Sequence, residues 1–409
     1  MGDILFLSHR IPFPPDRGDK IRSHHVLKAL AGLAPVHVAT FTDDVQDYRS
    51  EPELAAIAAS YRLVRRRKPL VLAGIEALAT GQPLSLAAFH DHRLKRYIAD
   101  VVTHHDISVI YVFSGQMAQY VPAAFHGRVV ADLVDVDSAK FEAYAEKREG
   151  VRRWIERRES RLLKAEEARI ARTSDLTLLV SEAEAALLRS RLDPGVPTNP
   201  ICGMGNGMDS AHFAPAHVAP EPRMLEKGSP RLIFTGQMDY LPNVQAALRA
   251  IERIMPRVRK SFPDASLHVV GRNAPPALKA YSGRNGIEVW GRVDDIRPWL
   301  AGADIALVPL AIARGVQNKV LEAMAMRLPV VLSPEAATGI EARDGWHFLT
   351  APSDEALADA VIALAGDPPR AKVMATAARS WIVANASWEM ALAQLPTYLG
   401  FNSGLSDAA

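Results

Sequence analysis

The sequence contains a single cysteine, Cys202, so it has no pair that could form an internal disulfide. This shortage argues against a small disulfide-stabilised secreted fold and fits a reducing compartment. No apolar run reaches the roughly 20 residues that a membrane-spanning helix needs. The first residues, MGDILFLSHR, lack the basic region, apolar core and cleavage site of a signal peptide. We therefore expect a protein of the cytoplasm.

The chain also has no excess of charge of either sign. Its 48 basic residues nearly balance its 46 acidic residues, which leaves a formal charge of +2. Without a strong positive field we expect no nucleic-acid partner. Hydrophobic residues make up 48% of the chain and charged residues 23%, as in globular proteins. A length of 409 residues suits two α/β domains better than one.

Unbroken apolar runs alternate with helical patterns in both halves of the chain. Such runs indicate strands of a parallel sheet that helices cover on both faces. In the first half they lie at 4–7, 36–41, 107–113, 129–134 and 176–180, and the pattern restarts at Arg231. We predict an α/β fold with two doubly wound Rossmann-like domains, residues 1–193 and 231–385, facing each other across a cleft. Residues 194–230, rich in proline, glycine and alanine, form the predicted linker region.

The segment LVPLAIARGVQNKVLEAMAMRLPVVL (307–332) predicts a buried strand, a polar loop, a short helix and a second buried strand. The polar residues around the N-terminus of this helix are Gly315, Gln317, Asn318 and Lys319. Phosphates bind at such points because free helix N–H groups and the helix dipole favour negative charge. Lys319 adds a positive charge. Glu322 lies about one turn further in, where a carboxylate can accept hydrogen bonds from a ribose diol. The loop predicts a nucleoside diphosphate site.

A second candidate phosphate contact follows the first predicted strand. Gly18 permits close approach of the backbone to a ligand, and Lys20 and Arg22 lie early in the next helix. Two basic residues there run against the helix dipole, a small cost that is easier to understand if they face a phosphate across the cleft. The alternative is an ordinary turn glycine followed by a solvated helix start.

Two charged segments favour solvated surfaces but also allow a peripheral membrane contact. Residues 141–172 are dense in Glu and Arg at helical spacing, which predicts one solvated helix. A basic cluster precedes the apolar stretch 69–79, a combination that can mark contact with anionic lipid. The cluster consists of Arg62, Arg65, Arg66, Arg67 and Lys68.

Several longer motifs carry a family resemblance. They include SHRIPFPPDRGDKIRSHHVLKALA, DLVDVDSAKFEAYA, GNGMDSAHF, FTGQMDYLPNVQAA, VWGRVDDIRPWLAGADIALVPL and ARGVQNKVLEAMAM. The second half resembles the nucleotide-sugar-binding domain of GT-B glycosyltransferases of the retaining class known as group 1. The whole chain is similar to the bacterial subgroup associated with exopolysaccharide synthesis and the PEP-CTERM/exosortase system.

The resemblance implies a transferase that moves a sugar from a nucleoside diphosphate (NDP) sugar with retention at the anomeric carbon. It implies no cofactor and no metal. The acceptor would be a glycan or a lipid-linked precursor at the inner face of the membrane. Residues 386–409 resemble the terminal helix that crosses back to the first domain.

The resemblance also assigns site residues. Of the two acids in the class's Glu-x7-Glu element, Glu322 matches the one that contacts ribose, and Arg314 replaces the one that contacts the sugar. Where the class commonly has Arg and Lys after the domain's first strand, this chain has Gln237 and Pro242. The cations left for the diphosphate are Lys319, Arg314 and Arg272, with Lys20 and Arg22 from the other domain. Gly236 and Asn243 share the loop of Gln237, and the loop of Trp290 and Arg292 is expected near the base.

Asp135 and Asp137 are the acceptor-side candidates, and they form the catalytic set with Lys319 and Arg314. Their spacing fits a metal motif, but they follow a strand of the first domain, so metal binding is the minority interpretation. Capping of a helix by Asp137 or Ser138 is as plausible as handling of an acceptor hydroxyl. The class often has a sugar-binding His near here, for which His9, His24 and His25 are possible substitutes.

Two other functions remain open from the sequence. A nucleotide-sugar epimerase would use the same fold and donor without an acceptor. A non-catalytic scaffold of a polysaccharide complex would fit the altered donor motif.

Overall fold

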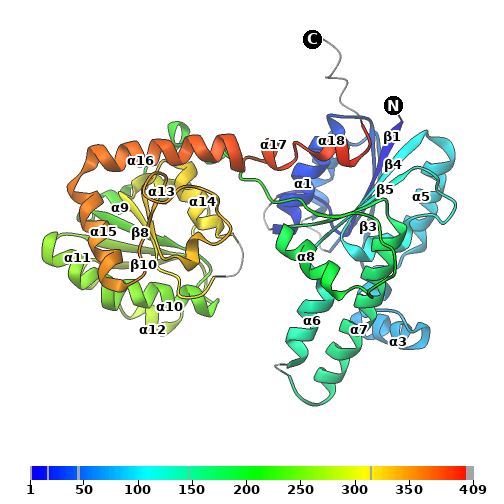
Figure 1. Ribbon diagram of the computed structural model, residues 1–409, viewed down its shortest axis with the longest axis horizontal. Coiled ribbons are helices and arrows are strands. Elements are labelled where there is room, and N and C mark those ends of the chain that lie inside the picture. Colours follow the sequence, from blue (N-terminus) through cyan, green and yellow to red (C-terminus); the bar gives the residue numbers. More distant parts are fainter. Residues whose placement is uncertain (1, 16–17, 44–46, 147, 314–315, 402–409) are drawn as a thin grey trace, which may run out of the picture. The chain divides into compact units, whose positions relative to one another are not determined.

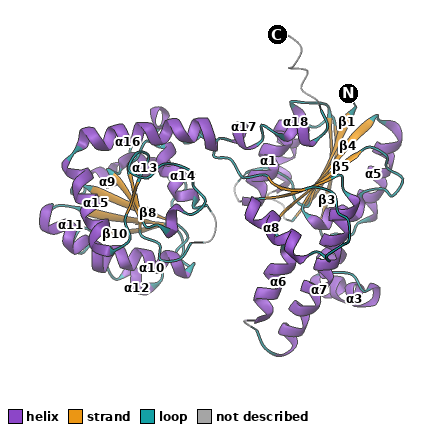
Figure 2. Cartoon of the chain, viewed as in Figure 1, coloured by secondary structure: helices purple, strands orange, loops and turns teal. Residues whose placement is uncertain are grey.

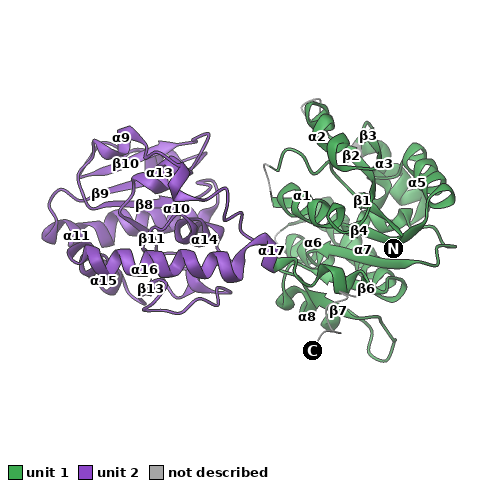
Figure 3. Ribbon diagram, turned by 90° about the horizontal axis from the view of Figure 1, so that it is seen from above, with its two compact units in different colours: residues 1–206, 391–409 green, residues 207–390 purple. Residues whose placement is uncertain are grey.

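The computed structural model describes all residues except 1, 16–17, 44–46, 147, 314–315 and 402–409. It divides into two compact units, each described here by itself (Figure 3). Unit 1 contains residues 1–206 and 391–409, and unit 2 contains residues 207–390. In the described part of the chain, no helix is long and apolar enough to cross a membrane.

Unit 1 is built on a seven-stranded parallel sheet in the order β3-β2-β1-β4-β5-β6-β7. The strands are β1 (Asp3–Ser8), β2 (Val36–Thr42), β3 (Ser60–Arg65), β4 (Ile107–Phe113), β5 (Arg128–Val134), β6 (Leu176–Leu179) and β7 (Ile201–Gly203). The helices are α1 (Gly18–Ala31), α2 (Glu51–Ile57), α3 (Leu70–Thr80), α4 (Leu84–Ala88), α5 (His92–His104), α6 (Asp137–Glu146), α7 (Gly150–Thr173), α8 (Glu182–Arg191) and α18 (Leu395–Tyr398). The apolar runs of the first half became its central strands, as predicted.

Unit 2 repeats the plan with a six-stranded parallel sheet in the order β10-β9-β8-β11-β12-β13 (Figure 2). The strands are β8 (Arg231–Thr235), β9 (Ser266–Val270), β10 (Ile287–Gly291), β11 (Ile305–Val308), β12 (Val330–Leu332) and β13 (Leu349–Thr350). The helices are α9 (Pro222–Leu225), α10 (Leu241–Arg249), α11 (Met255–Ser261), α12 (Pro276–Lys279), α13 (Arg297–Gly302), α14 (Asn318–Ala325), α15 (Asp354–Gly366) and α16 (Pro368–Trp381). The α/β fold with two Rossmann-like sheets is therefore confirmed.

The chain passes between the units twice, near Asn206 and in α17 (Trp388–Ala391). At the first passage Gly207 lies so close to the backbone of Trp388 that a Cβ would collide with it. Residues 194–230, predicted as one linker region, are shared: β7 joins the sheet of unit 1, and α9 lies in unit 2. The predicted terminal helix 386–409 is instead two short helices in its described part, α17 and α18.

The single helix predicted for 141–172 is a helical hairpin, in which α6 and α7 lie side by side (Figure 1). Gly150, which begins α7, has a φ of +62°, a conformation that side chains other than glycine rarely adopt. Spacing of charges alone did not reveal this break, because glutamates continue at three- and four-residue spacing, Glu142, Glu146 and Glu149, from α6 to the start of α7.

The two cations predicted to face a phosphate across a cleft instead form buried ion pairs inside unit 1. Arg22, 1% exposed, donates to both carboxylate oxygens of Asp132 at 3.0 and 3.2 Å and to Oδ1 of Asn206 at 2.9 Å. Lys20, 3% exposed, donates to Oδ1 of Asp47 at 2.7 Å. The proposed phosphate contacts of Lys20 and Arg22 are therefore corrected: both stabilise the fold around α1.

We expect Arg22→Met to lower the free energy of unfolding by about 3–5 kcal/mol, because it leaves the carboxylate of Asp132 buried without its cation. Urea denaturation followed by circular dichroism measures the change. Arg172→Met, at an exposed arginine of α7, is the matched control and should cost less than about 0.5 kcal/mol. Equal effects of the two substitutions would contradict the assignment.

Candidate functional site

Three glycines end the neighbouring strands β8, β9 and β10 of unit 2: Gly236, Gly271 and Gly291. The amide of Gly236 donates to the carbonyl of Val270 at 3.1 Å, and that of Gly271 to Gly291 at 2.8 Å. A Cβ on Gly271 would collide with the carbonyl oxygen of Gly236. A Cβ on Gly236 would lie 2.9 Å from Nδ2 of Asn243 and 3.0 Å from Nζ of Lys319. At the carboxyl edge of this sheet the backbone is therefore packed so closely that Gly236 and Gly271 leave no room for a larger side chain.

Lys319 and Asn243 meet over this glycine edge. Nζ of Lys319, from α14, donates to Oδ1 of Asn243, from α10, at 2.6 Å. Nδ2 of Asn243 donates to the carbonyl of Gln237 at 2.9 Å, and Nζ of Lys319 lies 4.7 Å from the ring centre of Phe234. The structure thus brings together Gly236, Gln237, Asn243 and Lys319, which the sequence analysis had placed in one site. We call these four residues, with Glu322, the donor cluster.

Two ionisable groups of the donor cluster are shifted toward neutrality. Burial lowers the pKa of Lys319 to about 8, partly offset by the negative charge of Glu322. Burial raises the pKa of Glu322 to about 6, partly offset by Lys319. Among the described residues, no hydrogen bond to the Glu322 carboxylate is formed. A desolvated ammonium and a carboxylate with free lone pairs are suited to binding a ligand that carries both anionic and hydroxyl groups.

The remaining predicted donor residues of unit 2 differ in how they are held and in whether the structure describes them. Gln317 is the N-cap residue of α14, which begins at Asn318, and the carbonyl of Gln317 accepts from the amide of Val320 at 2.9 Å. The carbonyl of Arg272 accepts from the amide of Met238 at 2.9 Å, which holds the backbone of exposed Arg272 against the β8–α10 loop. Arg292 is exposed just after β10. Arg314 and Gly315 lie outside the described residues.

Trp290 does not offer its ring to a ligand, which corrects its assignment to the base-binding loop. Its Nε1 donates to Nδ1 of His268 at 3.0 Å, and its ring packs 4.8 Å from that of Trp299. The guanidinium of Arg223 covers the indole at 5.4 Å. Trp290 is therefore part of the packing at the edge of the sheet, the commoner fate of a tryptophan that ends a strand.

In unit 1, strained backbone marks the ends of β4 and β5. Val134 has a φ of +71° and Ser114 a φ of +78°, values that β-branched and ordinary residues avoid. Such conformations cost on the order of 1–3 kcal/mol and cluster at functional sites. A small pocket lies between them, and its lining includes Gly115, Asp135 and Asp137. The strain turns the chain directly into the two predicted acceptor-side aspartates.

Asp135 and Asp137 lie half-exposed beside one cation. Nζ of Lys140 is 3.2 Å from Oδ1 of Asp137 and 3.7 Å from Oδ2 of Asp135. Neither aspartate caps α6: the amide and hydroxyl of Ser138 both donate to Glu167, at 2.9 and 2.5 Å. Burial raises the pKa of Glu167 to about 7. Because Glu167 satisfies this helix end, the capping interpretation of Asp137 is wrong, and both aspartates remain available.

The remaining candidates of unit 1 are Gly18 and three histidines. A Cβ at Gly18 would meet nothing within 4 Å, so no close approach requires glycine there. His9 is buried, with its ring stacked 5.9 Å from that of Phe113 and its Nε2 3.4 Å from Oδ2 of Asp19. His24 and His25 stack edge-on against each other. These contacts give the histidines packing roles, and the ligand contact at Gly18 stays a prediction.

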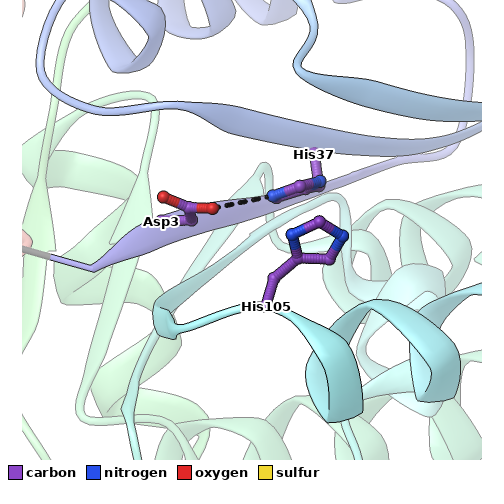
Figure 4. Close-up of side chains that lie close together, drawn as sticks. All are labelled: Asp3, His37 and His105. Atoms are coloured by element: carbon purple, nitrogen blue, oxygen red, sulfur yellow. Dashed lines mark hydrogen bonds and ion pairs between the residues drawn. The ribbon is translucent and has the colours of Figure 1, made fainter.

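One group of metal-type ligands occurs among the described residues, and within unit 1 it lies away from Asp135 and Asp137. Asp3, His37 and His105 meet at the amino ends of β1 and β2, the edge opposite the strained turns (Figure 4). Nε2 of His37 is 3.0 Å from Oδ2 of Asp3, and its Nδ1 is 2.7 Å from Oγ of Ser60. These bonds join β1, β2 and β3 and account for the buried imidazole.

A family model matches part of unit 2. Residues 229–367, about a third of the chain, match the model of the family described as Glycosyl transferases group 1. The matched segment contains the whole donor cluster. No curated protein sequence matches the chain. The match to this family is therefore confined to a segment of unit 2.

Solved structures extend the likeness to the whole fold. Sucrose-phosphate synthase from Thermosynechococcus elongatus has a TM-score of 0.60 at 16% identity, covering 97% of this chain and 98% of its own. HepE from Anabaena, in complex with UDP and glucose, has a TM-score of 0.60 at 13% identity, covering 98% and 100%. A glycosyltransferase from Rickettsia africae has a TM-score of 0.59 at 15% identity, covering 98% and 99%. At these identities the likeness shows the fold, which is GT-B.

Removing the ammonium of the donor cluster should weaken nucleotide binding. We expect Lys319→Met to lower the affinity for a nucleoside diphosphate roughly tenfold or more, because a hydrogen bond to a charged group contributes about 1.5–3 kcal/mol. UDP, GDP and ADP are first compared by thermal shift, and the best of them is titrated by calorimetry. Lys372→Met, on the exposed surface of α16, is the control. Unchanged affinity in Lys319→Met would remove Lys319 from the site.

The shifted pKa values predict a bell-shaped pH dependence of binding. Glu322, with a pKa of about 6, loses its carboxylate below that pH, and Lys319, with a pKa of about 8, loses its charge above that pH. Affinity should therefore fall on both sides of the interval. Because nucleotide phosphates also titrate near pH 6, Glu322→Gln serves as the control. On the acid side, Glu322→Gln should show only the decrease in affinity that comes from the nucleotide phosphate. On the alkaline side, it should keep the decrease that comes from Lys319. Identical pH profiles of the variant and the wild type would contradict the role of Glu322.

Proposed function

We propose that the protein transfers a sugar from an NDP-sugar to a glycan or lipid-linked acceptor. The observation that carries the proposal is the donor cluster, in which Lys319, Asn243 and Gly236 converge at the N-terminus of α14. This arrangement lies within the matched group 1 domain. We propose that the donor binds to unit 2 and that unit 1 supplies the acceptor contacts.

The donor cluster has the chemistry that the reaction requires. Breaking the glycosyl–phosphate bond builds negative charge on the leaving diphosphate, and catalysis requires groups that stabilise this charge. Lys319 carries the positive charge, and the N-terminus of α14 adds the positive end of its helix dipole. The lowered pKa of Lys319 reflects a desolvated ammonium, which gains most when an anion approaches. Glu322 accepts hydrogen bonds from the ribose hydroxyls.

Side chains and a helix end thus provide the charge stabilisation that a bound cation provides in other transferases. On this ground, together with the family resemblance, we propose a metal-independent reaction that uses no cofactor. Retention at the anomeric carbon is proposed from the resemblance alone. HepE, one of the similar structures, was solved with UDP-glucose, so uridine diphosphate sugars are the first donors to test.

We propose that Asp135 and Asp137 bind the acceptor. Both carboxylates follow the strained turn at Val134, and neither caps α6. A half-exposed carboxylate can orient an acceptor hydroxyl or accept its proton. The ammonium of Lys140 lies beside both carboxylates. The motifs shared with exopolysaccharide and PEP-CTERM-associated transferases support an acceptor of that pathway at the cytoplasmic face of the membrane.

A transfer assay tests the proposal. Purified protein should release nucleoside diphosphate from its donor faster when membrane glycolipid extract is added, and the double variant Asp135→Asn/Asp137→Asn should lower that rate about a hundredfold or more. Donor affinity should stay unchanged, since both aspartates lie in unit 1. Asp193→Asn, at an exposed position of unit 1, is the control.

Two results would contradict transfer, and a third would contradict the acceptor site. Conversion of the donor into its epimer without an acceptor would identify an epimerase. No binding of any nucleotide would favour a scaffold, and full activity of the double variant would remove the aspartates from the acceptor site.

A further inference from the structure

Helix α3 presents its large apolar side chains to the solvent. Its inward face consists of Ala73 and Ala77, which are 0% and 1% exposed. Its outward side carries four large aliphatic side chains that are 56–74% exposed, Val71, Leu72, Ile75 and Leu78. At 100° per residue, three of these four lie on the stripe opposite the two alanines. An amphipathic surface helix normally has the reverse arrangement, so the outward face of α3 is suited to an apolar environment.

The first two turns of α7 show the same feature. Val151, Trp154 and Ile155 are between 43% and 74% exposed. They are spaced at i, i+3 and i+4, so they form one stripe along the helix. The next position of this stripe is Arg158, whose side chain contacts α3. Trp154 is one of the exposed side chains best suited to the boundary between water and apolar material.

Hydrogen bonds fix α3 and α4 against α7. Nη2 of Arg158 donates to the carbonyl of Ala77, in α3, at 2.6 Å and to that of Gln82 at 3.2 Å. The carboxylate of Glu159 accepts from the amides of Leu84 and Ser85, at the start of α4, at 2.8 and 3.1 Å. Figure 1 shows α3 beside α7 at one end of unit 1. Trp154 and Ile155, at the near end of the stripe on α7, therefore lie about one helical turn, roughly 5.4 Å, along the helix from the contact of Arg158 with α3.

We define the apolar patch as the exposed side chains of both helices: Val71, Leu72, Ile75, Leu78, Val151, Trp154 and Ile155. Basic residues flank it in the sequence on both elements. Three precede α3 and three lie on α7, and no ion pair with a described residue is formed by any of them: Arg62, Arg65, Arg67, Arg152, Arg153 and Arg157. Arg66 and Lys68, also in the predicted cluster, are held instead by Asp43 and Glu76.

We propose that the apolar patch docks unit 1 onto an anionic lipid bilayer. Aliphatic side chains and Trp154 enter the interfacial region, and the flanking arginines contact lipid phosphates. An 11-residue helix such as α3 is about 16 Å long, roughly half the hydrocarbon thickness, so the contact lies along the surface. Arginines that precede α3 or lie within α7, and that form no ion pair with a described residue, complement a surface of negative headgroups.

The proposal deepens the proposed function, since a lipid-linked acceptor lies in the bilayer and docking would bring the enzyme to it. Vesicle binding nevertheless requires neither donor nor acceptor. Failure of docking and failure of the transferase assignment can therefore be distinguished.

Co-sedimentation with vesicles tests the docking. The full chain should pellet with phosphatidylcholine vesicles that contain phosphatidylglycerol, more weakly at higher salt, and little with phosphatidylcholine alone. We expect Ile75→Glu/Trp154→Glu to reduce the bound fraction roughly tenfold, since both positions are already exposed and tolerate charge in water. Val373→Glu, at a comparably exposed valine of α16 (59%), is the matched control and should bind like the wild type.

The arginines are tested separately. Arg62→Ser/Arg65→Ser/Arg67→Ser should weaken the preference for anionic vesicles without removing it, because the three arginines of α7 remain. Nucleotide affinity should be unchanged in all variants. Absence of vesicle binding by the wild type, or equal binding by Ile75→Glu/Trp154→Glu, would overturn the proposal. So would dimers of the wild type that this variant dissociates, because the apolar patch would then be a protein interface.

Discussion

The proposed chemistry depends on one lysine ammonium that the fold holds partly out of water. Taking that charge from solvent is unfavourable, which is why the pKa of Lys319 falls to about 8. The cost is tolerated because Nζ has a hydrogen bond to Asn243 and the π face of Phe234. Gly236 leaves the space that this arrangement needs. In the proposed function, the donor phosphate would replace the hydration that the ammonium has lost. Binding would therefore offset the unfavourable free energy of burying the charge.

Unit 1 handles its buried cations in the opposite way. Arg22 and Lys20 each have a carboxylate partner, Asp132 and Asp47, at hydrogen-bonding distance. A paired, buried cation is electrostatically satisfied and has little to gain from a ligand. Lys319 instead donates to the neutral side-chain amide of Asn243, and only part of the effect of burial on it is offset by Glu322. The contrast explains why cations that look equivalent in the sequence have different roles.

Features that depend on neighbouring residues in the sequence could be predicted, whereas those that depend on distant partners could not. Unbroken apolar runs predicted the central strands. The polar loop followed by an apolar pattern predicted the short helix α14 that carries Lys319 and Glu322, because helix spacing is local. The partners of Lys20 and Arg22 lie 27 and 110 positions away, so no local pattern revealed them. Gly271 was missed although FTG, VVG and VWG end three successive strands alike. That repeat was a usable signal for a glycine-lined sheet edge.

Helix α3 shows where a sequence pattern stops being informative. Its residues, LVLAGIEALAT, are apolar nearly all around the helix, so composition does not say which side faces the sheet. Packing decides: only the small Ala73 and Ala77 allow the backbone of α3 to approach the body of unit 1, where Arg158 reaches its last turn. Leucine or isoleucine on that inner side would push the helix away. Close approach on the inside therefore places the large side chains outside, and their exposure results from the packing that anchors the helix.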